Sequence, residues 1–264
     1  MELLRLPGRL FLDFLHYLGQ LAALVGDLGY SVRQGVLRLR LVAHQIVSIG
    51  YGSQTVVVVT GAFTGAVFTF QSYMNFKQFG VETSVGAIVS VALCRELGPV
   101  LAGLMVAGRV GASMAADIGT MKVTEQIDAL RVIGVDPVGY LVLPRFIAMM
   151  VSMPLLIAES ITFGLLASYL VTVVAYEMPI PWFMTHMVEH TNMTDLSVGM
   201  IKGFVFGIII TLVSCHQGLM ANDGAVGVGN GTTRAVVISS LALLISNFFL
   251  SILLNYFFPM GATS

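Results

Sequence analysis

Charged residues are scarce in this sequence, where Asp, Glu, Lys and Arg together make up 10% of 264 residues. A soluble domain carries roughly 25% charged residues, because a globule must cover its surface with polar groups. Hydrophobic residues reach 56%, which excludes a soluble fold. Helices satisfy their own backbone hydrogen bonds in lipid, whereas an open sheet does not. The composition therefore predicts an all-α membrane protein.

Motifs for metals, disulfides, nucleic acid and catalysis are also lacking. Cys94 and Cys215 lie in separate apolar runs without a CxxC or Cys/His cluster, and the net charge is −1. His186 and His190 have no context that indicates a metal site. The glycine-rich run 224–231 lacks the Lys-Ser/Thr pair of a phosphate-binding loop, so we interpret it as a flexible turn. We expect a non-catalytic chain with no metal and no cofactor of its own.

Five apolar segments are long enough to cross a bilayer, which takes about 20 helical residues. They are Gln54–Phe76, Ser84–Ala116, Leu141–Ala175, Leu196–Leu219 and Arg234–Phe258. The second and third exceed one straight crossing, and Gly98-Pro99 and Pro154 are the expected break points. We assign residues 51–264 to a transmembrane domain.

Residues 1–50 are predicted to form amphipathic helices in the membrane interface. Apolar residues recur at helical spacing in the first helix, and a second segment from Val32 to Ile49 has a basic face. The first pattern consists of Leu3, Leu10, Phe14, Leu18 and Leu21.

Lysine and arginine placement predicts the orientation, since cytoplasmic loops are rich in both. Ten basic residues fall on the side of the N-terminal segment, and only Lys77 falls on the other side. The N-terminus is therefore expected in the cytoplasm and the C-terminus outside.

Arg95 and Glu96 lie in the middle of the second span, directly before Leu97-Gly98-Pro99. A charge there costs at least ~2.5–3.5 kcal/mol, so such residues normally face a protein interior or a wet cavity. Neighbours on a helix cannot simply neutralise each other, and Lys202 and Glu159 are candidate partners. One interpretation is an ion-pair network that fixes helix packing; the other is a polar patch in a substrate cavity.

Aromatic residues near the outer end of the first span favour the cavity. They are Phe68, Phe70, Tyr73, Phe76 and Phe79. An aromatic-lined cavity with a few charges suits an amphiphile with acyl tails. An interfacial aromatic belt is the alternative, and it explains Tyr73 well.

The connection Thr120–Pro137 predicts a short cytoplasmic helix over about 124–134. Thr124 is the expected N-cap, and Gly134 with Asp136-Pro137 ends the helix. Ile127, Leu130 and Ile133 are expected to dock on the membrane domain, leaving the charges exposed to a soluble partner.

The stretch RELGPVLAGLMVAGRVGASMAADIGTMKVTEQIDALRVIGVDPVGYLVLPR, from Arg95 to Arg145, closely resembles the signature of MlaE-type permeases. GVGNGTTRAVVISS, from Gly227 to Ser240, is similar to the family pattern before the last span. The family consists of membrane subunits of ABC transporters that move phospholipids between the inner and outer membranes of Gram-negative bacteria. The resemblance therefore implies an MlaE-type fold, and it covers residues 45–258.

The resemblance also implies partners. They are a second copy of this chain, a cytoplasmic MlaF-like ATPase that binds ATP and Mg²⁺, an MlaB-like STAS-domain protein and a periplasmic hexamer of MlaD-like MCE-domain subunits. It implies an inner-membrane location and a role in outer-membrane lipid asymmetry. The implied lipid-cavity residues are Arg95, Glu96, Leu97, Phe68, Asn75, Phe76, Phe79 and Lys202. The implied ATPase-coupling residues are Thr124, Glu125, Gln126, Asp128, Leu130 and Arg131.

Three functional hypotheses follow. The first is the permease of an ATP-driven phospholipid transporter. The second is a secondary transporter of amphiphiles driven by protons through Glu96 and Glu159. The third is a structural anchor for a periplasmic complex, in which Arg95 and Glu96 would have no role in transport.

Overall fold

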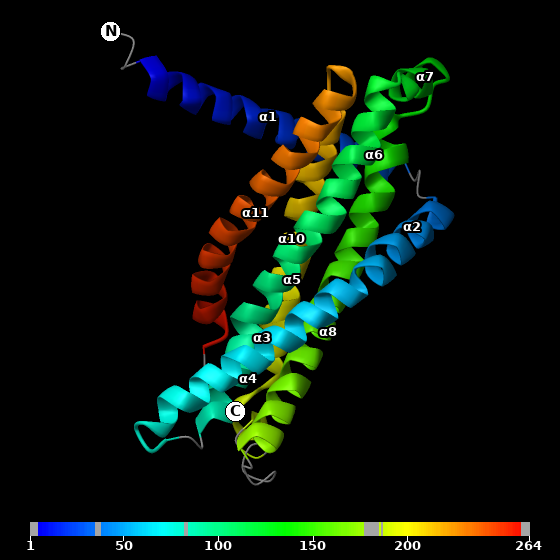
Figure 1. Ribbon diagram of the computed structural model, residues 1–264. Coiled ribbons are helices and arrows are strands. Elements are labelled where there is room, and N and C mark those ends of the chain that lie inside the picture. The colour runs from blue at the N-terminus through cyan, green and yellow to red at the C-terminus, as the bar shows by residue number, and fades with distance from the viewer. Residues whose placement is uncertain (1–4, 35–37, 82–83, 177–184, 186, 260–264) are drawn as a thin grey trace.

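The chain forms a tilted bundle of long helices with one helix lying across its end (Figure 1). The structure, a computed structural model, describes residues 5–34, 38–81, 84–176, 185 and 187–259. Within these ranges it is helical and contains no strand, as predicted. Residues 177–184, His186 and Leu3 lie outside the described residues.

Five described segments are long and apolar enough to cross a membrane, which confirms the expected number. They are Leu39–Lys77, Val85–Val123, Val138–Tyr176, Met193–Leu219 and Gly224–Phe257. The first two are composite helices in which α-helical pieces join through π-helical turns, and the third begins with a π-helical turn. The first contains α2 (Leu39–Ile46), a π turn at Val47–Tyr51 and α3 (Gly52–Lys77).

The second crossing contains two π turns. It runs through α4 (Val85–Ala92), a π turn at Leu93–Leu97, α5 (Gly98–Val106), a π turn at Ala107–Gly111 and α6 (Ala112–Val123). Pro99 lies in the first turn of α5, where a missing N–H is tolerated. The helix therefore continues past Gly98-Pro99, with the irregularity taken up by the π turn rather than by a break.

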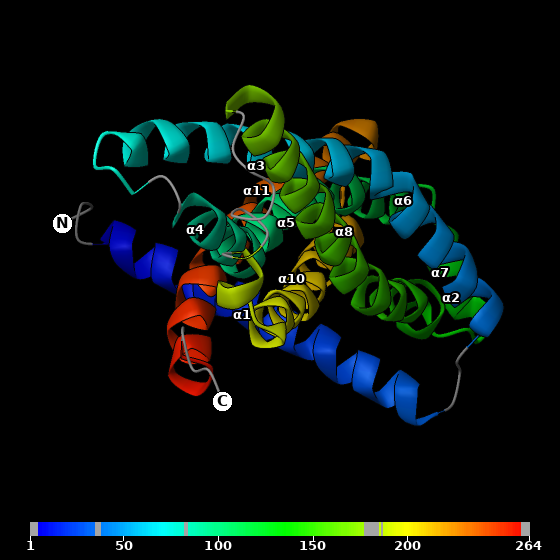
Figure 2. The ribbon, with the colours of Figure 1, turned by 90° about the horizontal axis from the view of Figure 1, so that it is seen from below.

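The third crossing is a π turn at Val138–Val142 followed by α8 (Leu143–Tyr176), which holds Pro154 in its interior without ending there. The fourth is α10 (Met193–Leu219), and the fifth is α11 (Gly224–Phe257). α3 packs along α8, and α10 packs against α6, α8 and α11 (Figure 2). α11 bows outward along one side of the bundle (Figure 1).

The predicted flexible turn at 224–231 is instead the start of α11, so this expectation was wrong. Gly231 lets α11 approach α10 closely, since a Cβ at Gly231 would lie 3.3 Å from the Gln217 carbonyl oxygen. On the facing helix, a Cβ at Gly119 of α6 would come within 3.4 Å of the Val228 side chain. Glycine on both helices therefore allows close packing here.

Helix α1 (Arg5–Arg33) lies across the bundle at the end where α7 also lies (Figure 1). Its C-terminal half is fixed to the bundle. Leu24 and Leu28 are buried, the Ser31 hydroxyl donates to Asp136 Oδ2 (2.7 Å), and Gln20 hydrogen-bonds His216 of α10 (3.1 Å). Leu18 is exposed. The second predicted amphipathic segment begins as a helix at Leu39 and is continuous with the first crossing.

The helix in the connection after the second crossing is α7 (Gln126–Val132). Thr124 is not its N-cap, which corrects the sequence interpretation. The Thr124 hydroxyl instead donates to the Thr120 carbonyl of α6 (2.8 Å). α6 ends at Val123, and Glu125, which has a left-handed backbone with φ 61°, reverses the chain before α7. Gly134, with φ 76°, ends α7 as predicted. The Gly134 and Val135 amides bond to the Arg131 and Leu130 carbonyls in a Schellman motif.

Candidate substrate-binding site

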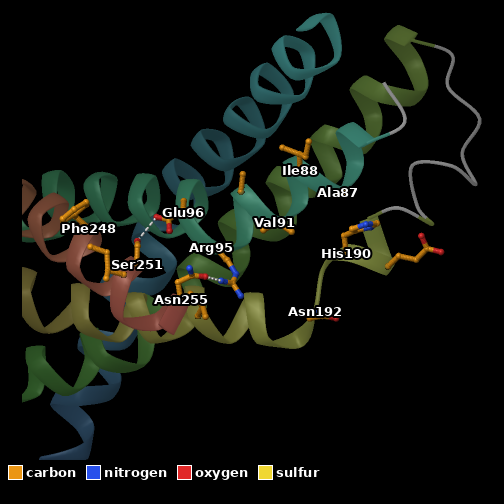
Figure 3. A pocket seen from close by; sticks show the side chains of 14 residues that line it. Ala87, Ile88, Val91, Arg95, Glu96, His190, Asn192, Phe248, Ser251 and Asn255 are labelled. Carbon is orange, nitrogen blue, oxygen red and sulfur yellow. Dashed lines mark hydrogen bonds between the residues drawn. The ribbon is translucent and has the colours of Figure 1, made fainter. Parts of the chain in front are cut away.

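A cavity of ≈ 1040 Å³ lies at the end of the bundle opposite α7. α4 and the following π turn form one wall, the start of α10 forms another, and the last turns of α11 form a third (Figure 3). Most of its surface is apolar, with polar groups gathered at Arg95 and Glu96. The lining residues are Ala87, Ile88, Val91, Ala92, Arg95, Glu96, Glu189, His190, Asn192, Val198, Phe248, Ser251, Ile252 and Asn255.

Glu96 forms an ion pair across this wall. Its carboxylate lies 2.8 Å from Nζ of Lys202 on α10, and it accepts hydrogen bonds from Asn247 Nδ2 (3.1 Å) and Ser251 Oγ (3.2 Å) on α11. Lys202 is fully buried, whereas the Glu96 side chain remains 44% exposed. The pair thus joins three helices while one carboxylate stays accessible from the cavity.

Arg95 forms a second charged cluster. Its Nε donates to Asp195 Oδ1, and its Nη1 and Nη2 donate to the Asn255 side chain (3.3 Å) and the Phe258 carbonyl (3.0 Å). Both Arg95 and Asp195 are buried. The Asp195 carboxylate also accepts a hydrogen bond from the main-chain N–H of Asn192 (2.9 Å), which completes a capping box at the N-terminus of α10. A charge in the apolar part of the bundle is thereby paired and hydrogen-bonded, as burial requires.

Lys202 also stabilises the π turn Leu93–Leu97, which contains both Arg95 and Glu96. Pro99 has no N–H to donate to the carbonyl of Arg95, four residues earlier. Lys202 Nζ donates to that carbonyl instead (2.7 Å) and also to Ser251 Oγ (2.9 Å). One ammonium group therefore holds a side-chain carboxylate, a main-chain carbonyl and a hydroxyl.

The residues that the sequence predicted to line the cavity lie in three different parts of the structure. Arg95 and Glu96 line it, and Lys202 lies beneath Glu96. Phe68 and Leu97 line a separate hollow of ≈ 390 Å³ against α3. Phe76 packs near Tyr73, while Asn75 is exposed and Phe79 is 78% exposed at the end of α3. One copy of the chain therefore does not bring the α3 aromatics into the large cavity.

Two candidate partners for the charges were proposed from the sequence. Lys202 is the partner of Glu96, as expected. Glu159 accepts a hydrogen bond from Gln54 Nε2 (2.7 Å) on α3, and it is not among the residues that line the large cavity.

Sequence reasoning missed the polar residues that complete the site. Local sequence places Asp195 in an acidic outer loop, although Asn192 three residues earlier matches a capping box and indicates a helix start. Asn247, Ser251 and Asn255 recur every four residues and so share one face of an otherwise apolar helix. That spacing was a readable signal that this face meets other polar groups.

Helix α7 presents a different kind of surface at the opposite end. Ile127 is buried against the bundle and Leu130 is partly buried, as predicted, but Ile133 is 71% exposed and Val132 is 87% exposed. Asp128 pairs with Lys122 of α6 (3.2 Å) and with Arg131 (3.1 Å). Thr124, Glu125, Gln126 and Arg131 are exposed. Apolar and charged groups side by side on a projecting helix are typical of a protein-binding surface.

Comparison with known proteins decides the family. The family model described as Permease MlaE matches residues 42–253. The chain belongs to the MlaE permease family.

Relatives of this MlaE-family permease occur in bacteria and chloroplasts. A probable ABC transporter permease of Rickettsia typhi is 45% identical over 85% of this chain and 86% of its own length. A probable ABC transporter permease of Synechocystis is 40% identical over 228 residues, which are 86% of this chain and 87% of that protein. The chloroplastic protein TRIGALACTOSYLDIACYLGLYCEROL 1 of Arabidopsis thaliana is 37% identical over 91% of this chain and 68% of its own length. The chain is thus a multi-pass ABC transporter permease, a class of subunit that works with an ATPase partner.

Proposed function

We propose that this permease moves phospholipids between the bacterial inner membrane and a periplasmic partner made of MCE domains, and so maintains the lipid asymmetry of the outer membrane. The observation that carries the proposal is the ≈ 1040 Å³ cavity, whose lining is mostly apolar with one accessible carboxylate. Binding sites for amphiphiles combine these two properties, because acyl tails need apolar walls and a headgroup needs a few fixed polar partners.

A relative supports a lipid as the substrate class. The name of the Arabidopsis protein, TRIGALACTOSYLDIACYLGLYCEROL 1, contains that of a diacylglycerol lipid. A phospholipid has the same diacylglycerol body with a phosphate-containing headgroup. In this proposal the tails lie against side chains such as Val91 and Ile252, and the headgroup lies near Glu96.

The energy source in this proposal is a separate MlaF-like ATPase, since the sequence has no phosphate-binding loop. The surface of α7 around Asp128 and Ile133 is the coupling surface, and it transmits nucleotide-driven closure of the ATPase to the bundle. The permease acts as a homodimer with an MlaB-like regulator and an MlaD-like hexamer. The N-terminus is cytoplasmic and the C-terminus periplasmic, as the basic residues favour.

Photocrosslinking to lipid tests this function. A photoreactive amino acid at Ile252, which lines the cavity, is compared with one at Leu244, which is an exposed residue of the same helix outside the cavity lining. In the membrane-reconstituted complex with the ATPase, Ile252 is expected to capture radiolabelled phospholipid in an amount that changes on adding ATP. Leu244 is expected to capture lipid independently of ATP.

Equal, ATP-independent capture at both positions would contradict the proposal. Capture that depends on the proton gradient and not on ATP would favour the secondary-transporter hypothesis. No capture at Ile252, with normal assembly of the complex, would favour the structural-anchor hypothesis.

A further inference from the structure

A second, smaller pocket lies nearer the α7 end of the bundle and shares no lining residue with the large cavity. Its volume is ≈ 340 Å³, and it is bounded by α2 and the π turn at Val47–Tyr51, by the π turn at Ala107–Gly111 with α6, and by the start of α8. Its lining is mostly polar. The side chains that matter for its chemistry are His44, Ser48, Arg109, Ser113, Asp117 and Arg145.

Two guanidinium groups dominate this pocket. Arg109 donates from Nη1 to the Ser53 hydroxyl (2.8 Å), and its guanidinium lies against Gly52, where a Cβ would come within 2.6 Å of Nη2. Arg145 is 8% exposed and donates from Nη1 to the Leu141 carbonyl (2.8 Å). A guanidinium carries five N–H donors. Among the described residues, each group therefore uses only a small part of its hydrogen-bonding capacity.

The pocket carries more positive than negative charge. Asp117 is its only described carboxylate; it lies 3.8 Å from Arg145 Nη2, beyond hydrogen-bond distance, and its side chain is 59% exposed. Two arginines facing one solvated carboxylate leave an excess of about one positive charge in a membrane-spanning region, where charge is costly. An added oxyanion would balance this charge and accept the unused N–H donors.

The pocket lies part-way along the second crossing. The crossing Val85–Val123 has 39 residues, so it is about 58 Å long, well beyond the ~30 Å hydrocarbon layer. Arg109 lies about 21 Å along the helix from Arg95 and about the same distance from the end at Val123. The pocket is therefore well separated from the large cavity, on its α7 side.

We propose that this inner pocket binds a phosphate group, with Arg109 and Arg145 as its cationic ligands. Planar guanidinium groups bind phosphate through paired hydrogen bonds, which a single ammonium group does not provide. The hydroxyls of Ser48 and Ser113 line the same pocket and supply further donors. The phosphate belongs either to a phospholipid headgroup of the inner leaflet or to a soluble phosphoester. The site requires binding only, so it stands or falls separately from transport through the large cavity.

The test uses the full-length chain, purified in detergent and stripped of lipid. Three probes separate the chemistry. Phosphatidylglycerol carries tails and phosphate, diacylglycerol carries tails alone, and glycerol 3-phosphate carries phosphate alone. A photoreactive amino acid at Ser48 reports occupancy of the pocket by radiolabelled probe. We expect capture of phosphatidylglycerol and little capture of diacylglycerol. Competition by millimolar glycerol 3-phosphate would indicate that the phosphate suffices, and its failure would indicate that the lipid headgroup is the source.

Substitutions identify the ligands. Arg109→Gln is expected to weaken capture at least tenfold, since losing one charge-assisted hydrogen bond corresponds to about that factor. Lys77→Gln, which removes an exposed cation at the other end of the first crossing, should leave capture unchanged. Ser113→Glu places a carboxylate in the pocket while both arginines remain, and it should abolish capture, whereas Ser113→Gln should not.

Equal capture of diacylglycerol and phosphatidylglycerol would overturn the proposal. So would unchanged capture by a folded Arg109→Gln or Ser113→Glu variant. Should Arg109→Gln fail to fold, the comparison of Ser113→Glu with Ser113→Gln decides the question alone.

Discussion

The Lys202 ammonium group lies 2.8 Å from a Glu96 carboxylate oxygen, at a position where the lysine has no exposed surface. The same nitrogen lies 2.7 Å from the Arg95 carbonyl oxygen. Lys202 therefore contacts the backbone as well as Glu96, and it stabilises the π turn Leu93–Leu97 that contains both Arg95 and Glu96. Its removal should affect the helix as well as the cavity.

Lys202→Met is expected to destabilise the protein by about 3 kcal/mol, near the lower end for a broken buried ion pair, because Glu96 keeps access to the cavity. The matched control is Lys77→Met, which removes an exposed lysine and should cost little. Chemical unfolding in detergent, followed by circular dichroism, measures both. A loss no larger than that of the control would mean that the pair contributes nothing to stability.

Pro99→Ala offers a test of the backbone contact. In the Lys202→Met background, the alanine that replaces Pro99 has an N–H that can bond to the Arg95 carbonyl, so the double variant should recover part of the lost stability. In the presence of Lys202 the same change should have a smaller effect. Equal effects in both backgrounds would contradict a link between Pro99 and Lys202.

Asp195→Asn is expected to be more destabilising than Asn192→Ala. The first change removes the charge that pairs with buried Arg95, whereas the second removes only the reciprocal cap, worth ~1 kcal/mol. The difference in unfolding free energy between the two variants isolates the ion pair. If Asn192→Ala costs as much as Asp195→Asn, Asp195 acts through the helix cap alone.

Asp128→Lys is expected to uncouple the permease from its ATPase partner without unfolding it. Asp128 is about half exposed, and a lysine in its place would put a third cation beside Lys122 and Arg131. Asp223→Lys, at the exposed turn before α11, makes the same change of charge elsewhere at that end and serves as the control. ATPase activity and copurification of the two subunits are measured. Normal copurification and normal ATP-driven transport by Asp128→Lys would show that this part of α7 is not the coupling surface.

Gly65→Ala is expected to disrupt the contact between α3 and α8. A Cβ at Gly65 would lie 2.1 Å from the Gly164 carbonyl oxygen, so the two backbones must separate, at a cost of about 1–3 kcal/mol or more. Gly26→Ala in α1 has no atom within 4 Å of the new Cβ and should be neutral or slightly stabilising. Thermal unfolding of the two variants gives the comparison.

Most of the architecture was predictable because the bilayer restricts it. Twenty or so apolar residues in a row have few alternatives to a spanning helix, so the five crossings and the end of α7 at Gly134 were readable. The start of the fifth crossing was not, because glycine content suggests a turn when the neighbouring helix that it packs against is unknown.

The residues of the site were predictable only where charged residues interrupt an apolar segment. Arg95, Glu96 and Lys202 met that condition, and Lys202 was correctly identified as a partner. Asp195 did not, because local sequence places it at a loop boundary and only the fold brings it to Arg95. The position of Phe79 depends on how α3 is oriented, which an apolar helix of low amphipathicity does not specify.

The π turns have a consequence for the placement of charge. Arg95 and Arg109 are fourteen residues apart, and in an uninterrupted α-helix their side chains would lie about 40° apart around the axis. Each lies within a π turn, and they contact different neighbours: Arg95 contacts α10 and α11, while Arg109 contacts α3. The extra residue of a π turn changes the angular phase of the helix. Without the two π turns, the same fourteen residues would direct both arginines toward nearly the same side of the protein.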